Sequence, residues 1–181
     1  TSYCYWIMET EISAKVYKKY IESTGRTYKG EMIISNIDKT CTYYTEDEQI
    51  ANIAAGNVTY QDSLDFTKWL LSDLPANIAC TLQLRIPTFL EHRHAAHGNS
   101  KDNWYWGNDE NDAIRAEAMS IRGGAYRKRG KPNGLGIYDM YGNIFEWVMD
   151  RVRSAYYCSL RNGVIDPLGD LNAECGTFVF E

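Results

Sequence analysis

The chain has little of several residue types, and each shortage excludes a class of protein. Only 4 of its 181 residues are proline, while aromatic residues make up 13%. This composition is typical of a globular chain and excludes a disordered or collagen-like one. No run approaches the ~18 apolar residues that a membrane-spanning helix needs, so we expect no membrane span. The length fits one compact domain with a substantial core, and we expect residues 1–181 to form a single domain.

Basic charge and paired cysteines are also scarce. The 19 Lys and Arg against 24 Asp and Glu give a net charge of −5. The one basic run, residues 122–131, is interrupted by glycines and is not part of a recognition helix, so we expect a solvated loop and no nucleic-acid partner. The dispersed, odd set of cysteines predicts buried thiols or at most one or two bridges, and it leaves the redox compartment open. The five cysteines, none in a Cys-x-x-Cys pair, are Cys4, Cys41, Cys80, Cys158 and Cys175.

Local patterns predict helices early in the chain and loops late. Ser13 is placed to cap a helix that ends at Gly25. Residues 59–62 and 88–91 each have the form of an N-terminal capping box and predict two further helices. From Asn99 onward short apolar runs, glycines and asparagines replace helical periodicity, which favours an α+β fold rich in loops. The expected apolar face of the first helix comprises Val16, Tyr17, Tyr20 and Ile21.

Residues 133–148 (Asn-Gly-Leu-Gly-Ile-Tyr-Asp-Met-Tyr-Gly-Asn-Ile-Phe-Glu-Trp-Val) carry the strongest signal. Glycines at turn positions, aromatic residues between them and two carboxylates, Asp139 and Glu146, predict a rigid, hairpin-like element in which the carboxylates face each other across a Gly-Asn turn. The stretch closely resembles the Gly-Leu-Tyr-Asp-Met-x-Gly-Asn-Val-x-Glu-Trp motif of the formylglycine-generating enzyme (sulfatase-modifying factor) family, whose fold is a variant of the C-type lectin fold.

The resemblance continues in order along most of the chain. Residues 5–13, 57–63, 84–91 and 104–108 are similar to the family's opening strand, second-helix, Arg-Leu-Pro-Thr and Tyr-Pro-Trp-Gly-Asn segments. Only the last fifth is hard to align. The resemblance implies a C-type lectin-like α+β fold of the formylglycine-generating enzyme type, with helices packed on a small, mostly antiparallel sheet.

The family's copper chemistry is not expected here. The resembling enzymes hold copper with two cysteines in a Cys-x4-Cys spacing, and Cys158 matches the second of them. Arg153 stands where the first belongs, and a guanidinium has no lone pair for a soft metal. We therefore expect no catalytic residues, no copper and a packed Cys158 thiol. The alternative is a formylglycine-generating or sulfoxide-synthase-like oxidase, or a degenerate relative of one.

The resemblance also implies a calcium site in the motif. In the enzymes the corresponding positions bind calcium, and here they are the carboxylates of Asp139 and Glu146 and the carbonyls of Gly142 and Ile144. Oxygen ligands from a tight turn suit Ca²⁺, which we expect to be structural. The alternative is that these carboxylates accept backbone N–H bonds and stabilise the turn without metal. A calcium-dependent sugar lectin is disfavoured, because the Glu-Pro-Asn type of triplet is absent.

Three histidines form the other metal-like cluster. On a helix His94 and His97 share a face, whereas His92 points roughly 200° away from His94. The three side chains cannot converge on one ion without a break in the helix, so hydrogen-bonded or partly exposed histidines are expected.

The C-terminal region, residues 151–181, has fixed-looking anchors with chemically mixed residues between them. Such mixed side chains on a fixed scaffold are what a binding face needs. The pattern resembles the variable proteins of diversity-generating retroelements, in which the C-terminal region of a lectin-like fold is rewritten by mutagenesis. The candidate ligand-binding residues are Ser154, Ala155, Tyr157, Ser159, Gly163, Val164, Ile165, Gly169, Asp170, Ala173 and Glu174.

The sequence thus favours a non-catalytic, receptor-recognition protein that displays a hypervariable C-terminal surface. The expected partner is a protein or glycan on a target surface. A viral particle or cell surface is the favoured location, and the oligomeric state is open.

Overall fold

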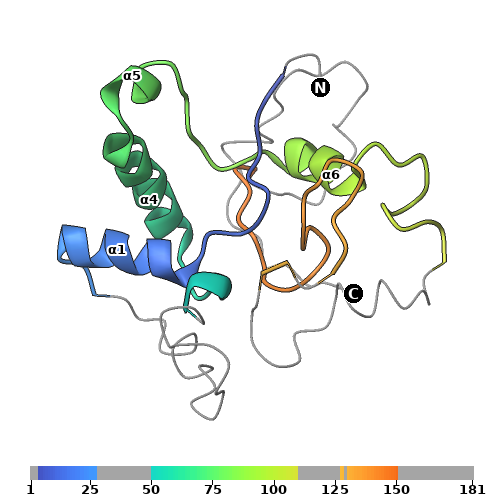
Figure 1. The fold of residues 1–181 in the computed structure, drawn as a ribbon, viewed down its shortest axis with the longest axis horizontal. Helices are drawn as coiled ribbons and strands as arrows, with labels where there is room; N and C mark the ends of the chain where they lie inside the picture. The colour runs from blue at the N-terminus through green and yellow to red at the C-terminus, as the bar shows by residue number, and fades with distance from the viewer. Residues whose placement is uncertain (1–3, 28–49, 110–126, 129, 151–181) are drawn as a thin grey trace, which may run out of the picture.

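The computed structural model describes residues 4–27, 50–109, 127–128 and 130–150. These residues contain α1 (Ala14–Thr24), α4 (Tyr60–Asp73), the short α5 (Ala76–Ala79) and α6 (Phe89–His97). Helices α1 and α4 lie together on one side, and α6 lies on the other side with residues 130–150 looped around it (Figure 1). Within the described residues, no helix has the length and apolar character to cross a membrane.

Three helices begin after the caps that the sequence predicted, and α1 also ends at the predicted glycine, whereas the short α5 was not predicted. The Ser13 hydroxyl accepts from the Val16 N–H at 3.3 Å, and the Thr59 hydroxyl accepts from the Asp62 N–H at 3.1 Å. At α6, Thr88 forms a complete capping box with the third helical residue. Gly25 ends α1 at φ 65°, the left-handed conformation in which glycine is unstrained. The three capping predictions are therefore confirmed.

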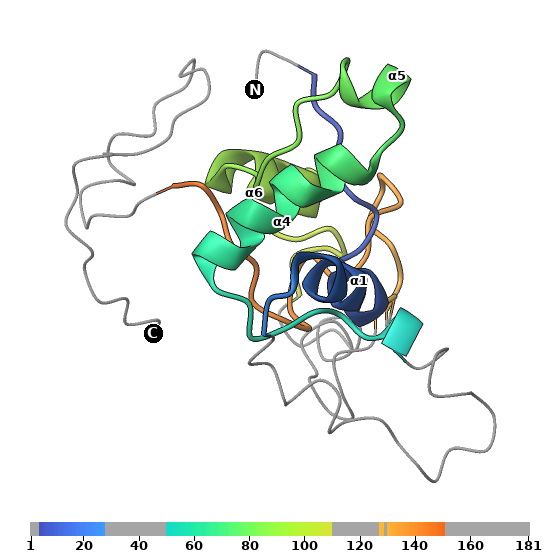
Figure 2. The ribbon, with the colours of Figure 1, turned by 90° about the vertical axis from the view of Figure 1, so that its left-hand side faces the viewer.

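An aromatic cluster joins α1 to α4. Tyr17 and Tyr20 of α1 and Phe66 of α4 are buried, and their ring centroids lie 5.4 to 5.6 Å apart. Trp69 extends the cluster, with its ring 5.4 Å from Tyr20 and 5.6 Å from Phe66. Tilted and edge-on rings at this spacing add to the stabilisation that burial provides. Figure 2 shows α1 nearly end-on, below α4.

The apolar face predicted for α1 is narrower than the sequence indicated. Ile21 packs partly buried against the aromatic cluster, as expected. Val16 is wrong as a core position, because its side chain is 38% exposed. Residues 17, 20 and 21 already occupy the stripe that faces α4, and residue 16 lies at its edge.

The predicted sheet stays a prediction. The described part of the chain contains only two isolated antiparallel bridges, Ser13 to Ala54 and Trp104 to Gly107. The single-domain organisation is likewise not tested by these residues.

The hairpin-like description of residues 133–148 is wrong as regards backbone pairing, because the described stretch has turns and bends and no strand ladder. Within it, the Asn133 N–H donates to the Ile137 carbonyl and the Gly136 N–H donates to the Asn133 carbonyl, both at 2.9 Å. Other backbone groups of the stretch and of Met149, which follows it, pair with distant segments. The Tyr138 N–H donates to the Glu9 carbonyl, and the Met149 N–H donates to the Pro87 carbonyl, both at 2.9 Å. The motif is therefore a loop held by its neighbours.

Candidate functional site

The motif, residues 133–150, holds the C-terminal end of α6 through a buried asparagine. The Asn133 side-chain amide donates to the Ala95 carbonyl at 2.7 Å. Its side-chain oxygen accepts from the N–H groups of Leu135 and Ile137, at 2.9 and 3.2 Å. One side chain thus pairs a helix-end carbonyl and closes the first turn of the motif.

The contact between the motif and the C-terminal end of α6 leaves no room for a Cβ on Gly98 or Gly134. A Cβ on Gly98 would lie 2.6 Å from the Asn133 side chain, and a Cβ on Gly134 would lie 2.4 Å from the Gly98 carbonyl oxygen. Glycine is required at these two positions because the motif and the helix end touch.

The last residues of the motif hold the other end of α6. The Asp150 carboxylate accepts from the Phe89 N–H at 2.5 Å, at the first residue of the helix. A carboxylate is stabilised there by the unpaired N–H groups and the helix dipole. Behind it, Arg85 forms a two-pronged ion pair with buried Glu91, at 2.6 and 2.7 Å. The motif therefore contacts α6 at both ends.

The N-terminal segment packs against the same assembly. The Tyr5 hydroxyl donates to the Glu91 carbonyl at 2.8 Å. The Arg127 guanidinium donates to the Thr10 hydroxyl at 2.8 Å and to the Ala51 carbonyl at 2.6 Å. The N-terminal segment thus contacts α6 through Tyr5, and Arg127 joins that segment to residue 51.

The motif also contacts α4 through Trp147. The Trp147 indole N–H donates to the Val58 carbonyl at 2.8 Å, and its ring lies edge-on to Tyr60, 5.7 Å between centroids. The indole is nonetheless 51% exposed.

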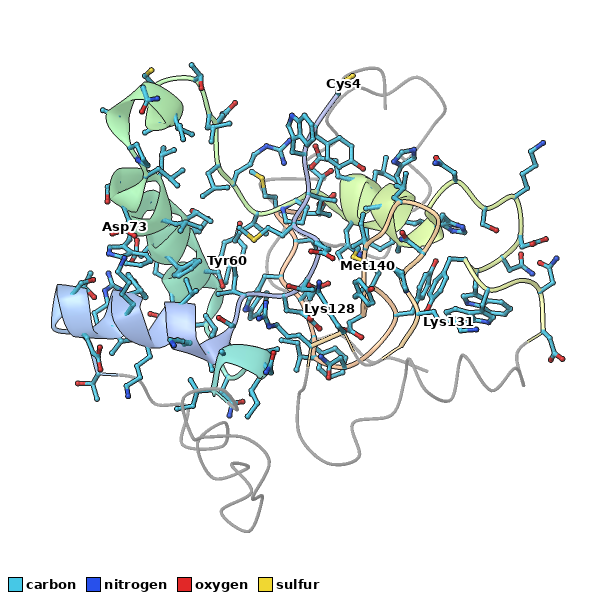
Figure 3. All side chains as sticks on the ribbon, in the orientation of Figure 1. Cys4, Tyr60, Asp73, Lys128, Lys131 and Met140 are labelled. Carbon is cyan, nitrogen blue, oxygen red and sulfur yellow. The ribbon has the colours of Figure 1, made fainter. Side chains whose placement is uncertain are left out.

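The two carboxylates predicted to bind calcium have different partners. The Asp139 carboxylate accepts from the Lys128 N–H at 2.5 Å. The Glu146 carboxylate lies 2.6 Å from the His92 ring nitrogen Nε2. Lys128 lies beside the motif in Figure 3. Asp139 sits at φ 59°, so its backbone is held in the left-handed region.

Asp139 accepts a backbone N–H bond, as the metal-free alternative expects, whereas the partner of Glu146 is the His92 ring and not a backbone group. Of the predicted carbonyl ligands, Gly142 is exposed and Ile144 is partly buried. Over the described ranges, no three histidine, cysteine or acidic side chains are grouped to hold a metal ion. Each carboxylate has a hydrogen-bond partner, and a carboxylate that accepts one hydrogen bond keeps further lone pairs with which it can bind an ion. Calcium at this turn stays a prediction.

Glu11 is a buried carboxyl that the sequence did not single out. Its Oε1 accepts from the Asn143 side-chain amide at 2.8 Å, whereas its buried Oε2 has no hydrogen-bond partner in the described structure. Burial raises the pKa of Glu11 to about 7, the hydrogen bond from Asn143 opposes this, and the charges of Asp139 and Glu146 raise it further. The only signal was its place in the segment that resembles the family's opening strand.

The three histidines of α6 contact three different groups. His92 pairs with Glu146, and His94 Nδ1 lies 3.1 Å from the Tyr5 hydroxyl. The His97 ring lies edge-on to Tyr141, with 6.4 Å between centroids. The side chains thus face separate neighbours, which the helical spacing predicted for His92 and His94.

An aromatic cluster lies beside the C-terminal end of α6. Trp104 and Trp106 are parallel at 5.7 Å, and Trp106 is edge-on to Tyr105 at 4.8 Å and to Tyr141 at 5.2 Å. The cluster links the Trp-Tyr-Trp-Gly-Asn stretch to the motif.

The candidate ligand-binding face lies outside the described residues, and so do Arg153 and Cys158. The residues concerned are Ser154, Ala155, Tyr157, Ser159, Gly163, Val164, Ile165, Gly169, Asp170, Ala173 and Glu174. Asp150, the residue that precedes this region in the chain, is described, and its carboxylate is bound to the N–H of Phe89 at the start of α6.

A family model supplies the identification. Neither a curated protein nor a solved structure matches the chain. The model of the sulfatase-modifying factor enzyme 1-like domain matches residues 2–177, nearly the whole chain, and this domain implies a C-type lectin-like fold. The chain therefore belongs to the family of the sulfatase-modifying factor enzyme 1-like domain.

Proposed function

We propose that this domain is a non-catalytic binding protein that presents residues 151–181 to a protein or glycan on a target surface. Within the family, we place it with the variable proteins of diversity-generating retroelements. The alternative is an oxidase of the formylglycine-generating or sulfoxide-synthase type, or a degenerate relative.

The observation that carries the proposal is the pair Arg153 and Cys158. The resembling enzymes need two thiolates in a Cys-x4-Cys spacing, and this chain has one thiol and one guanidinium at those positions. Arginine is always protonated and repels a cation, so a two-thiolate copper site does not form there. Without that site the family's oxidation chemistry has no metal.

The described structure supports the scaffold half of the proposal. A binding face that tolerates substitution needs a framework whose own stability comes from other residues. The motif is attached to α6 at both ends by Asn133 and Asp150. It is attached to the N-terminal segment through Tyr138 and Asn143. None of these contacts uses a side chain from residues 151–181.

Structural calcium is a separate part of the proposal, and it rests on the resemblance. The oxygen donors of the motif are of the type that Ca²⁺ takes. The ion adds no chemistry beyond holding the turn, and its presence or absence leaves the binding role unchanged.

An anaerobic Cu(I) titration tests the proposal against the oxidase alternative. We expect no tight stoichiometric complex in the wild-type chain, because a single thiolate does not make a bis-thiolate site. The matched variant is Arg153→Cys, which restores the spacing and is expected to gain one tight Cu(I) equivalent. The exposed thiol of Cys80 is a control, because Cys80→Ser leaves the titration unchanged. A 1:1 wild-type complex that disappears in Cys158→Ser contradicts the proposal.

A further inference from the structure

A group of cationic and phenolic side chains lies on and beside α6, the helix that Figure 1 shows on the other side of the molecule from α1 and α4. Arg93 and His97 are four residues apart and share one face of the helix. The Tyr141 ring lies 6.4 Å from the His97 ring and 6.1 Å from the Tyr105 ring. The Tyr105 hydroxyl donates to the Lys131 carbonyl at 3.3 Å, and Lys131 lies on this side in Figure 3. We call these five residues the Arg93 surface.

The cations of the Arg93 surface are not neutralised by the described structure. Arg93 and Lys131 are exposed, and neither is within ion-pair distance of a carboxylate in the described ranges. Most other cations there are paired, for example Arg26 with Asp65 and Lys128 with Glu9. In a chain of net charge −5, exposed cations without a carboxylate partner among the described residues are charge-complementary to an anionic ligand.

The C-terminal end of α6 repels an anion less than a helix end with unpaired carbonyl groups does. Carbonyl groups at the C-terminal end of a helix carry partial negative charge. At α6 the Ala95 carbonyl accepts from Asn133 at 2.7 Å and from the Gly98 N–H at 3.2 Å. The negative end is thereby paired by donors before a ligand arrives.

The chemistry of the surface fits a saccharide that carries a carboxylate. A guanidinium matches the two oxygens of one carboxylate in a fork, and a lysine beside it adds a second positive charge. Partly buried tyrosines offer an apolar ring for a sugar face and a polar tip for its hydroxyls. The Arg93 charge lies close enough to Tyr141 to oppose the rise that burial causes in the pKa of its hydroxyl.

We propose that Arg93, His97, Tyr105, Lys131 and Tyr141 form a binding surface for a carboxylated saccharide. Arg93 pairs with the carboxylate, Tyr141 and Tyr105 contact the sugar ring and its hydroxyls, and Lys131 adds charge at the rim. This surface is separate from the candidate residues between 154 and 174. Its failure leaves the proposed function of those residues standing.

The test is calorimetric titration of the whole chain with trigalacturonate and with its methyl ester, which is the same sugar without the charge. We expect trigalacturonate to bind and the ester to bind at least about tenfold more weakly, since a charge-assisted pair is lost. Arg93→Ala weakens trigalacturonate binding by about tenfold, and Tyr141→Phe weakens it by a smaller factor. Lys15→Ala, an exposed cation on α1, is the matched control and leaves binding unchanged.

Each other outcome overturns the proposal in a defined way. Equal binding of the ester shows that the charge is not read. Tighter binding of a sulfated galactan oligosaccharide assigns the surface to sulfate, and equal binding of triglutamate assigns it to acidic peptides. No binding of trigalacturonate, or binding that is unaffected by Arg93→Ala, removes the surface altogether.

Discussion

The α1–α4 pair and the motif around α6 are stabilised by different interactions. Between α1 and α4 the contact is made by buried aromatic rings, with Tyr20 and Phe66 at its centre. Around α6 it is made by polar side chains bonded to backbone, such as Asn133 to Ala95 and Asp150 to Phe89. Aromatic packing tolerates shifts in geometry, whereas buried hydrogen bonds specify one arrangement. The motif region is therefore the part suited to hold an attached binding face in a fixed position.

The largest loss of stability is expected from Phe66→Ala in the helix pair. Phe66 is 5% exposed and contacts three other aromatic rings. Removing a buried phenylalanine costs about 3–5 kcal/mol, so chemical denaturation should show that drop in the free energy of unfolding. Lys68→Ala on the exposed face of the same helix is the control and should change stability by about 0.5 kcal/mol or less. A small loss in Phe66→Ala contradicts the account of this core.

The sequence predicted the helix ends but not the polar contacts that hold the motif. A cap joins residues three apart, so Ser13, Thr59 and Thr88 could be identified from the chain alone. The contact of Asn133 with Ala95 spans 38 residues, and that of Arg127 with Thr10 spans 117. Such pairs require knowledge of which segments meet.

For the candidate site, too, the sequence predicted local geometry but not the partners that are distant in the chain. That His92 faces another group than His94 followed from the angle between positions on a helix, whereas the separate partners of His94 and His97 did not. The partners of Asp139 and Glu146 did not, because they come from residue 128 and from α6. Glu11 was missed because an isolated glutamate in an extended segment has no distinguishing local pattern.

The next largest effect distinguishes two helix-ending glycines with the same backbone conformation. Gly25 and Gly98 have φ of 65° and 58°, but only Gly98 would place a Cβ against Asn133. Gly25→Ala should lower the free energy of unfolding by about 1–2 kcal/mol, because alanine is strained in the left-handed conformation. Gly98→Ala loses the same free energy of unfolding and about 1–3 kcal/mol more, because the added methyl group is overpacked against Asn133. Urea denaturation of both variants measures the difference, and equal losses contradict the close contact between α6 and the motif.

A pH series tests the buried carboxyl of the motif region. The folded-state pKa of Glu11 is raised to about 7 from 4.5, so the folded state binds its proton more tightly than the unfolded state. Its contribution is fully present below pH 4.5 and is lost as the pH rises through about 7. Glu11→Gln should flatten this fall, which is on the order of 2 kcal/mol once solvent access to the group is considered. Parallel pH profiles of the variant and the parent argue against a buried, destabilised carboxylate.

Calcium is expected to have a smaller effect, because other contacts already hold Asp139 and Glu146. A bound ion stabilises the folded state by mass action, and a net gain of about 1 kcal/mol corresponds to about 2–4 °C in a domain of this size. Chelation should lower the melting temperature of the parent and leave that of Asp139→Asn unchanged. Identical melting curves with and without chelator leave the motif metal-free.

The central claim is that residues 151–181 carry a binding face on a scaffold stabilised elsewhere, and thermal melting of one multiple variant tests it most directly. The variant replaces Tyr157, Val164, Ile165, Asp170 and Glu174 by serine. Exposed positions change stability by about 0.5 kcal/mol each at most, so the five together cost less than Phe66→Ala and the variant should melt above it. A melting temperature at or below that of Phe66→Ala places these side chains in the core and contradicts the claim.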